Sequence, residues 1–275
     1  MNDTFVSVLN GKPYRVCKHG KIPIKDENIS SVSVISDEDF IKIPLLPDYP
    51  RLKCIDCANT SIIPNVIIYV LCHNEDRLDF AKYAYGNIPW AKPILMKYQD
   101  VTFENAFLKQ LLEISEEWCD CEMVGFVSAN AVNKMDFNTV VAAVQDRQKW
   151  NTGYCNFFRS ERKLLHDIHH PHIQEIIKDI KEELGLKLTI QAYYANYWMC
   201  TPYAMKRFIE WSHDKLIPAV LKHKYAFINS KYGKPYLTKK QCIALCGFPY
   251  YPNVPFILER LNACFFSTYF KDLIL

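Results

Sequence analysis

Apolar residues follow two patterns from residue 64 onward, namely short continuous runs and stretches with helical spacing. Residues 66–72 form a continuous, β-branched apolar run, which is typical of a buried parallel strand. Apolar residues at helical spacing follow over residues 78–85, with Asn74 as a candidate N-cap and Gly86 as a candidate end. The pattern therefore predicts a strand followed by an amphipathic helix.

The same alternation continues to residue 145. Strands are expected over residues 91–98 and 122–127, and helices over residues 103–114 and 136–144. This alternation predicts parallel strands with right-handed crossovers and helices on both faces of the sheet. Ligands of such sheets bind beyond the carboxyl ends of the strands. The loops at those ends are residues 72–77, 98–102 and 128–134.

The two ends of the chain are less regular. After residue 151 we expect strands over 153–158 and 186–194, and helices over 171–184, 202–211, 213–222 (kinked or restarted at Pro218) and 255–266. Gly185 is expected to end the helix over 171–184, and Thr201 is the candidate N-cap of the helix over 202–211. Residues 1–63 instead contain short strands around an Asn10-Gly11 turn, followed by Pro44, Pro47 and Pro50. We therefore expect a β-rich appendage over residues 1–63 and a main domain over residues 64–275. The main domain would consist of the halves 64–150 and 151–275.

Composition narrows the class of protein. The chain has 275 residues, of which 49% are hydrophobic and 14% aromatic, with 33 Lys+Arg against 30 Asp+Glu. This composition predicts a large core and excludes a disordered chain. A net charge of +3 is too small to indicate a nucleic-acid partner. The many Tyr and Trp suit either a flat-faced polar ligand or an aromatic core.

Targeting signals and common nucleotide motifs are missing from the sequence. The first residues have no basic region followed by an apolar stretch, and no run reaches the roughly 18 apolar residues of a membrane helix. We therefore expect a soluble, cytoplasmic protein with no transmembrane segment. With 8 Gly and neither G-x-G-x-x-G nor G-x-x-x-x-G-K-[ST], the chain is not expected to be a dinucleotide-binding dehydrogenase or a P-loop kinase.

Two clusters contain residues that bind metals. Cys54 and Cys57 form C-x-x-C, and Cys119 and Cys121 form C-x-C, so together they could bind a structural zinc ion. Free, mostly buried thiols are the favoured interpretation of the 11 Cys. Residues 166–172 contain four His, but Pro171 interrupts the cluster, and a solvated loop is favoured over a metal site.

Four segments carry a resemblance to a known family. Residues 67–76 (IIYVLCHNED) resemble the first strand and polar turn of GT-A-type glycosyltransferases. Residues 123–130 (MVGFVSAN), 194–203 (YANYWMCTPY) and 255–261 (PFILERL) resemble segments of glycosyltransferases from capsular-polysaccharide clusters and large algal DNA viruses. The order and spacing of the segments agree with those proteins over residues 64–268 and leave the first 63 residues without a counterpart.

The resemblance implies a fold and an activity. The fold would be α/β and GT-A-like (Rossmann-like), with a mixed, mainly parallel sheet flanked by helices. The activity would be transfer of a sugar from a nucleotide-diphosphate-sugar donor to a glycan or glycoprotein acceptor. For a viral protein, this would take place in the host cytoplasm.

The sequence departs from the family at its metal site. The family carries a D-x-D motif after the strand at residues 122–127, where this chain has Ser128, Ala129 and Asn130. The D-x-E formed by Asp120 and Glu122 precedes that strand. Either the predicted strand is out of register or the enzyme needs no metal, so metal dependence stays open and no metal ligand is assigned. Without a metal, cations would hold the diphosphate, the candidates being Lys134, Arg159, Arg162 and Arg260.

The resemblance assigns roles to particular residues. Glu259 is the first candidate for the base or charge stabiliser, with Asp136 as a second, and a structural Glu259–Arg260 pair is the alternative. The nucleotide-sugar is expected at Cys72, His73, Asn74, Arg77, Tyr98, Ser128, Asn130, Lys134 and Arg260, and the acceptor sugar at Tyr194, Tyr197 and Trp198.

Two other functions remain open. The chain could be a non-catalytic glycan- or protein-binding module that has kept the fold, as the missing D-x-D suggests. It could also be a zinc-stabilised interaction protein built on the four cysteines named above.

Overall fold

The structure is a computed structural model of the 275-residue chain. It describes residues 3–6, 13–17, 20–23, 33–34, 65–157, 159–160, 170–186, 192–193, 195–230 and 238–269. The chain divides into two compact units, one formed by residues 1–60 and 132–138 and the other by residues 61–131 and 139–275.

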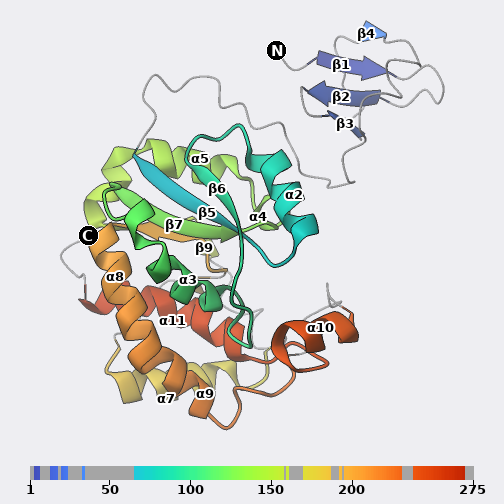
Figure 1. The fold of residues 1–275 in the computed structure, drawn as a ribbon. Helices are drawn as coiled ribbons and strands as arrows, with labels where there is room; N and C mark the ends of the chain where they lie inside the picture. Colours follow the sequence, from blue (N-terminus) through green and yellow to red (C-terminus); the bar gives the residue numbers. More distant parts are fainter. Residues whose placement is uncertain are drawn as a thin grey trace. The chain divides into compact units, whose positions relative to one another are not determined.

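The described N-terminal residues form a small β-sheet. Its strands are β1 (Asp3–Val6), β2 (Pro13–Cys17), β3 (Gly20–Pro23) and β4 (Ser33–Val34), in the order β3-β2-β1-β4 (Figure 1). β1 and β2 pair in antiparallel fashion with Val6 opposite Pro13, as the predicted hairpin requires. The predicted Asn10-Gly11 turn and the proline stretch lie outside the described residues.

A mixed sheet of five strands lies at the centre of the second unit, within the part of the chain that the structure describes (Figure 1). Its order is β6-β5-β7-β11-β8. β5, β6 and β7 are parallel, whereas β11 is antiparallel to both β7 and β8. The α/β class with a mixed, partly parallel sheet is therefore confirmed. The strands are β5 (Val66–Cys72), β6 (Ala91–Leu95), β7 (Met123–Ser128), β8 (Tyr154–Asn156) and β11 (Trp198–Cys200).

Gly125 explains how β7 and β11 can pair closely. In this pairing Gly125 lies opposite Met199, and Phe126 opposite Trp198. A Cβ atom at residue 125 would come within 2.2 Å of the Trp198 carbonyl oxygen. Only glycine fits this close backbone approach, which gives a physical reason for the V-G-F pattern of this strand.

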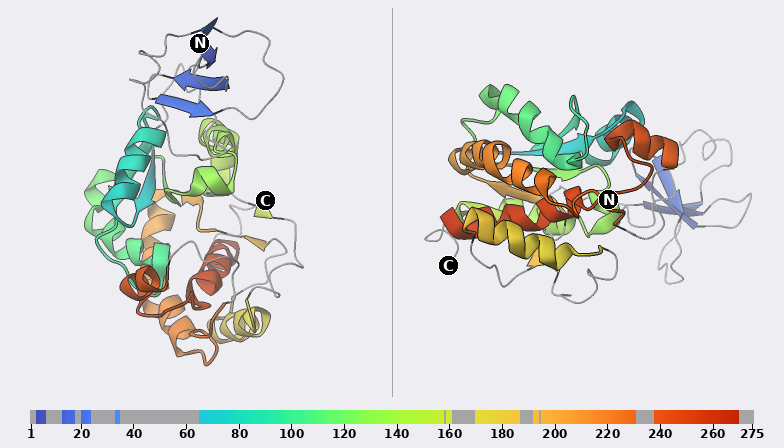
Figure 2. Two further views of the ribbon diagram at one scale, coloured as in Figure 1. Left: turned by 90° about the vertical axis from the view of Figure 1, so that its right-hand side faces the viewer. Right: turned by 90° about the horizontal axis from the view of Figure 1, so that it is seen from below.

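Helices and short connecting elements surround the sheet (Figure 2). Two helix starts agree with the predicted caps, since the Asn74 side chain accepts from the Arg77 N–H and the Thr201 side chain accepts from the Ala204 N–H. The elements are α2 (Glu75–Tyr85), η1 (Phe103–Ala106), α3 (Phe107–Glu113), η2 (Ser115–Glu117), α4 (Ala131–Lys134), α5 (Asn138–Gln145), η3 (Arg147–Thr152), β9 (Arg159–Ser160), α7 (Ile173–Leu184), β10 (Ala192–Tyr193), α8 (Pro202–Trp211), η4 (Ser212–Leu216), α9 (Ile217–Lys222), α10 (Lys239–Cys246) and α11 (Val254–Tyr269).

One turn of π-helix, η4, joins α8 to α9. Pro218 follows this turn and has no N–H to donate to the carbonyl four residues before it. The wider turn lets the helix continue through this missing hydrogen bond, so the interruption expected at Pro218 is a local widening of the helix.

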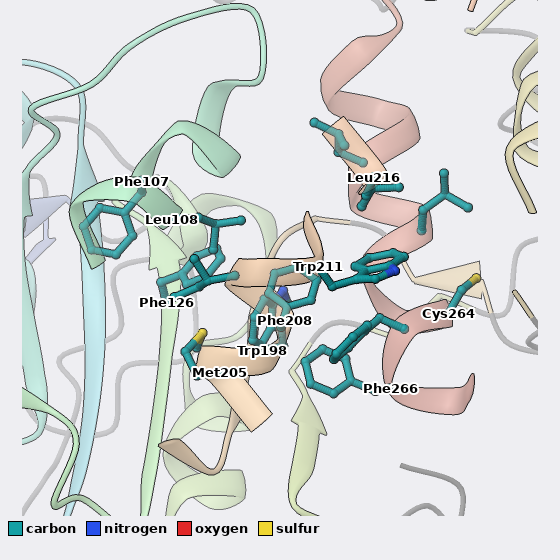
Figure 3. Packing of buried hydrophobic residues seen from close by; sticks show 14 of the residues in the cluster. Phe107, Leu108, Phe126, Trp198, Met205, Phe208, Trp211, Leu216, Cys264 and Phe266 are labelled. Atoms are coloured by element: carbon teal, nitrogen blue, oxygen red, sulfur yellow. The ribbon is translucent and has the colours of Figure 1, made fainter. Parts of the chain in front are cut away.

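Aromatic side chains fill the core between the sheet and α8 and α11 (Figure 3). The Trp198 ring lies 4.9 Å from the Phe126 ring, 5.0 Å from the Phe208 ring and 5.3 Å from the Phe266 ring, measured between centroids. All four side chains are buried. Much of the chain's high aromatic content therefore serves packing. No helix in the described ranges has the length and apolar character needed to cross a membrane.

Candidate functional site

The candidate site lies at the carboxyl ends of the parallel strands β5, β6 and β7. β11 is antiparallel to β7 and its first residue pairs with Phe126, so the turn before β11 reaches the same edge of the sheet. We call this region the carboxyl-end edge. It comprises residues 73–74, 96–106, 128–130 and 195–197, together with the residues of α11 that contact them, Glu259 and Asn262.

His73 follows β5 in this edge, where its surroundings favour the neutral form. Burial and the nearby Arg77 guanidinium lower the pKa of His73, and the Glu104 carboxylate opposes them more weakly. The His73 carbonyl accepts a hydrogen bond from Gln99 Nε2 at 2.7 Å. The predicted residues His73 and Arg77 therefore come together, along with two residues that the sequence did not indicate, Gln99 and Glu104.

Three other predicted donor-binding residues already have bonds within the protein. The Asn74 side chain caps α2. The Cys72 thiol is buried and donates to the Val70 carbonyl, and burial raises its pKa to about 11. The Tyr98 hydroxyl bonds to Glu113, while Lys109 Nζ lies 4.4 Å from the centre of the Tyr98 ring. Cys72 is thus a core residue, and the Tyr98 ring is covered by a cation.

Ser128 ends β7, and its hydroxyl lies 2.6 Å from the Tyr197 hydroxyl. The Tyr197 and Trp198 rings are buried, however, and Trp198 belongs to the aromatic core. A buried ring has no face left for a sugar, so the structure corrects the stacking role predicted for these two residues. Tyr194 lies outside the described residues.

Glu259 and Arg260 lie near the start of α11 and form a largely buried ion pair. Arg260 Nη1 is 3.9 Å from Glu259 Oε2, and their side chains are only 9% and 14% exposed. The same Glu259 oxygen accepts a hydrogen bond from the Ala195 N–H at 3.2 Å. The predicted carboxylate is therefore anchored to the turn that precedes β11, with a cation beside it.

Three buried asparagines link this turn to α11 and η1. Asn262 Nδ2 donates to Asn196 Oδ1 at 2.5 Å and to Asn105 Oδ1 at 3.3 Å, and Trp198 Nε1 donates to Asn196 Oδ1 at 3.2 Å. Asn196 Nδ2 and Asn262 Oδ1 are buried and have no hydrogen-bond partner among the described residues. A buried amide group without a hydrogen-bond partner lowers the free energy of unfolding, so its presence here calls for another role.

Two of these asparagines carry a weak signal in the sequence. Asn196 lies within the aromatic segment that carries the family resemblance, and Asn262 lies three residues after Glu259 on the same face of α11. Asparagine is a poor residue for a helix interior, so Asn262 could have been singled out on that ground.

Two non-glycine residues of the edge have positive φ angles. They are Phe103 at +53° and Ala195 at +64°. Each such backbone conformation costs on the order of 1–3 kcal/mol and persists only where the surrounding structure holds it. Backbone strain of this kind gathers at binding and catalytic sites.

The other predicted site residues show no contact among the described residues that supports a role in this site. Asn130 follows β7 in the sequence and is partly exposed. Lys134 and Asp136 belong to the other compact unit and are exposed, and Asp136 accepts a hydrogen bond from the Asn138 N–H at the start of α5. The Arg159 side chain and all of Arg162 lie outside the described residues.

The end of β7 does not fit a divalent metal ion. The strand ends at Ser128, one residue beyond the predicted end at residue 127, and no carboxylate follows before α4. Glu122 precedes the strand and pairs with Arg147 at 2.9 Å. Within the described ranges, no group of three His, Cys, Asp or Glu side chains could hold a metal.

The two clusters considered as possible metal sites lie only partly within the described residues. His170 is buried against the Phe256 ring, whereas His172 is exposed and bonds to Glu175 at 3.1 Å. Cys119 is exposed and Cys121 is partly buried. Cys54 and Cys57 lie outside the described residues.

Comparison with known proteins gives no further guidance. No protein-family model matches the chain, and neither the curated proteins nor the solved structures yield a match.

Proposed function

We propose that this protein is a glycosyltransferase that moves a sugar from a nucleotide-diphosphate-sugar donor to a glycan acceptor. One observation carries the proposal: the buried Glu259–Arg260 pair is anchored to the strained Ala195 amide at the carboxyl-end edge of a mixed α/β sheet. Ligands of open α/β sheets bind at this edge. A carboxylate and a cation are also the charges that glycosyl transfer from a diphosphate requires.

Glu259 is the proposed catalytic carboxylate. In an inverting reaction it would accept the proton of the acceptor hydroxyl, and in either stereochemical course it would stabilise the positive charge that develops on the donor sugar. The Ala195 N–H fixes the direction of this carboxylate, because it donates to Oε2. Arg260 supplies positive charge for the diphosphate leaving group.

The donor nucleotide is proposed to lie over the loop from residue 72 to residue 77, with its diphosphate toward Ser128 and Asn130. Neutral His73 and its neighbour Arg77 then supply hydrogen bonds and a cation at this end of the site. Because the end of β7 does not fit a divalent ion, no step of the proposed reaction passes through a metal.

A panel of nucleoside diphosphates tests the proposal. The purified chain is heated with uridine, guanosine or thymidine diphosphate, each with and without Mn²⁺. The proposal predicts that at least one of them raises Tm, because a ligand that binds only the folded state stabilises it. It is abandoned if none does.

A second candidate is a non-catalytic glycan- or protein-binding module on the same fold. The observation that favours it is the end of β7, where Ser128, Ala129 and Asn130 replace the family's D-x-D. Hydrolysis of donor sugars separates the two functions, since a binding module turns over no sugar nucleotide. Metal analysis of the same preparation tests the zinc-stabilised alternative.

A further inference from the structure

Phe103, in the segment after β6, has a positive φ angle. It begins η1 at φ +53°, a region that bulky side chains rarely adopt. The preceding turn holds it there, because the Asp100 carbonyl accepts the Phe103 N–H at 3.1 Å and Asp100 Oδ1 accepts the Thr102 N–H at 2.7 Å. Hydrogen bonds of the turn therefore hold Phe103 in a strained backbone conformation, and this conformation sets the direction of the Phe103 side chain.

The Phe103 ring forms a pair with a ring from a distant part of the chain. Its centroid lies 5.7 Å from that of Tyr251, with an angle of 34° between the planes. Both residues are partly exposed, whereas Phe107, one turn further along, is buried in the core. The pair thus offers an accessible aromatic surface beside the carboxyl-end edge.

Polar groups that can form hydrogen bonds to the edge of a heterocyclic ring lie next to this surface. Glu104, the residue after Phe103, is close enough to His73 to act on its charge. Gln99 Nε2 bonds to the His73 carbonyl, so the loops after β5 and β6 converge here. Tyr98, the aromatic residue that the sequence suggested for the nucleotide, is covered by Lys109 and bonded to Glu113.

We infer that Phe103 and Tyr251 form the stacking surface for the nucleobase of the donor, with His73, Gln99 and Glu104 at the edge of the base. Aromatic rings stack on nucleobases through their faces, and hydrogen-bonding side chains in the plane read the edge of the base. This inference rests on the proposed function, because it places part of the proposed donor. It replaces Tyr98 with Phe103 as the aromatic contact.

Three substitutions of Phe103 test the inference by calorimetric titration with the diphosphate that binds the wild type best. Phe103→Tyr keeps the ring and is expected to bind like the wild type. Phe103→Leu and Phe103→Gly remove the ring and are expected to weaken the nucleotide by about tenfold or more. The binding of inorganic pyrophosphate, which has no base, is expected to stay unchanged in all three variants.

Phe103→Gly also separates binding from folding. Glycine adopts φ +53° without steric cost, so this variant is expected to keep or raise Tm while it loses nucleotide affinity. A ring that serves only packing would instead lower Tm when it is removed and leave the affinity of the folded protein intact.

The outcomes distinguish this inference from the function on which it rests. If the wild type binds no nucleoside diphosphate, the proposed function fails and the inference fails with it. If the wild type binds one and Phe103→Leu binds it equally well, the inference alone is overturned. If Phe103→Gly folds poorly, Phe103→Leu decides the question.

Discussion

Trp198 and Asn196 are two residues apart, yet they belong to regions that differ in packing, hydrogen bonding and backbone strain. The Trp198 ring lies in an apolar cluster with Phe126, Phe208 and Phe266. Asn196 belongs to the carboxyl-end edge, where buried amides are incompletely hydrogen-bonded and two backbone angles are strained. The Trp198 cluster is packed ring against ring, whereas the edge combines incompletely hydrogen-bonded buried amides with two strained backbone angles within a few residues.

This difference separates a region that stabilises the fold from the region that we propose binds the ligand. A sequence specifies its fold when local preference, packing and hydrogen bonding agree, and exceptions gather where a protein binds or reacts. Changes in the core should therefore lower stability, whereas changes at the edge should affect ligands more than folding.

Phe208→Ala should have the largest effect on stability. Removing a buried aromatic ring costs about 3–5 kcal/mol of the free energy of unfolding, because it leaves a cavity in a close-packed core. Urea denaturation measures the change. Tyr203→Ala on the same helix is the control, since Tyr203 is 71% exposed and its loss should change stability by about 0.5 kcal/mol or less.

Glu259→Gln should abolish most of the sugar transfer at a smaller relative cost to stability, because the amide keeps an oxygen that can accept from the Ala195 N–H. Loss of a catalytic carboxylate is expected to lower the transfer rate by about 10²-fold or more. Glu210→Gln is the matched control on the exposed surface of α8, where the carboxylate forms an ion pair with Arg207. Equal transfer rates in the two variants would leave Glu259 as a structural partner of Arg260.

Gly125→Ala should weaken the centre of the sheet. The added methyl group would clash with backbone atoms of Trp198 and Met199, and such overpacking costs about 1–3 kcal/mol. Gly185→Ala is the comparison, because nothing lies within 4 Å of its Cβ position and its cost comes from the φ of +62° alone. Urea denaturation of both variants should rank Gly125→Ala as the more damaging.

His73 should produce the smallest effect, a pH dependence of stability. Its pKa in the folded protein is lowered, so the unfolded chain binds the proton more readily and stability falls as the pH drops through about 6.5, the ordinary value for histidine. His213 also has a lowered pKa, so the wild type is compared with His73→Gln over pH 8 to about 5. The variant should lose less stability at acid pH, and identical curves would contradict a neutral His73.

The sequence indicated much of the fold because most elements carry local signals. The run over residues 66–72, the caps Asn74 and Thr201 and the helix end at Gly185 are all where the pattern predicts them. Boundaries shifted where tertiary contacts decide. The strand expected over residues 91–98 ends at Leu95, and the helix expected over residues 103–114 divides into η1 and α3.

The candidate site was less predictable, because it depends on contacts between distant segments. Glu259 and Arg260 were found because they are adjacent within a recognisable segment. Asn105 and Asn262 are 157 residues apart, and no local pattern indicates that they meet. The positive φ angles at Phe103 and Ala195 could not be predicted either, because neither residue type favours such a conformation.

A donor screen with product detection decides whether this protein transfers sugar. The full chain is incubated with sugar nucleotides of uridine, guanosine and thymidine diphosphate, and released diphosphate and transferred or hydrolysed sugar are measured by mass spectrometry. We expect turnover of at least one donor by the wild type, and its loss in Glu259→Gln but not in Glu210→Gln. Absence of turnover with every donor, together with no rise in Tm from any of the diphosphates with or without Mn²⁺, would contradict this expectation.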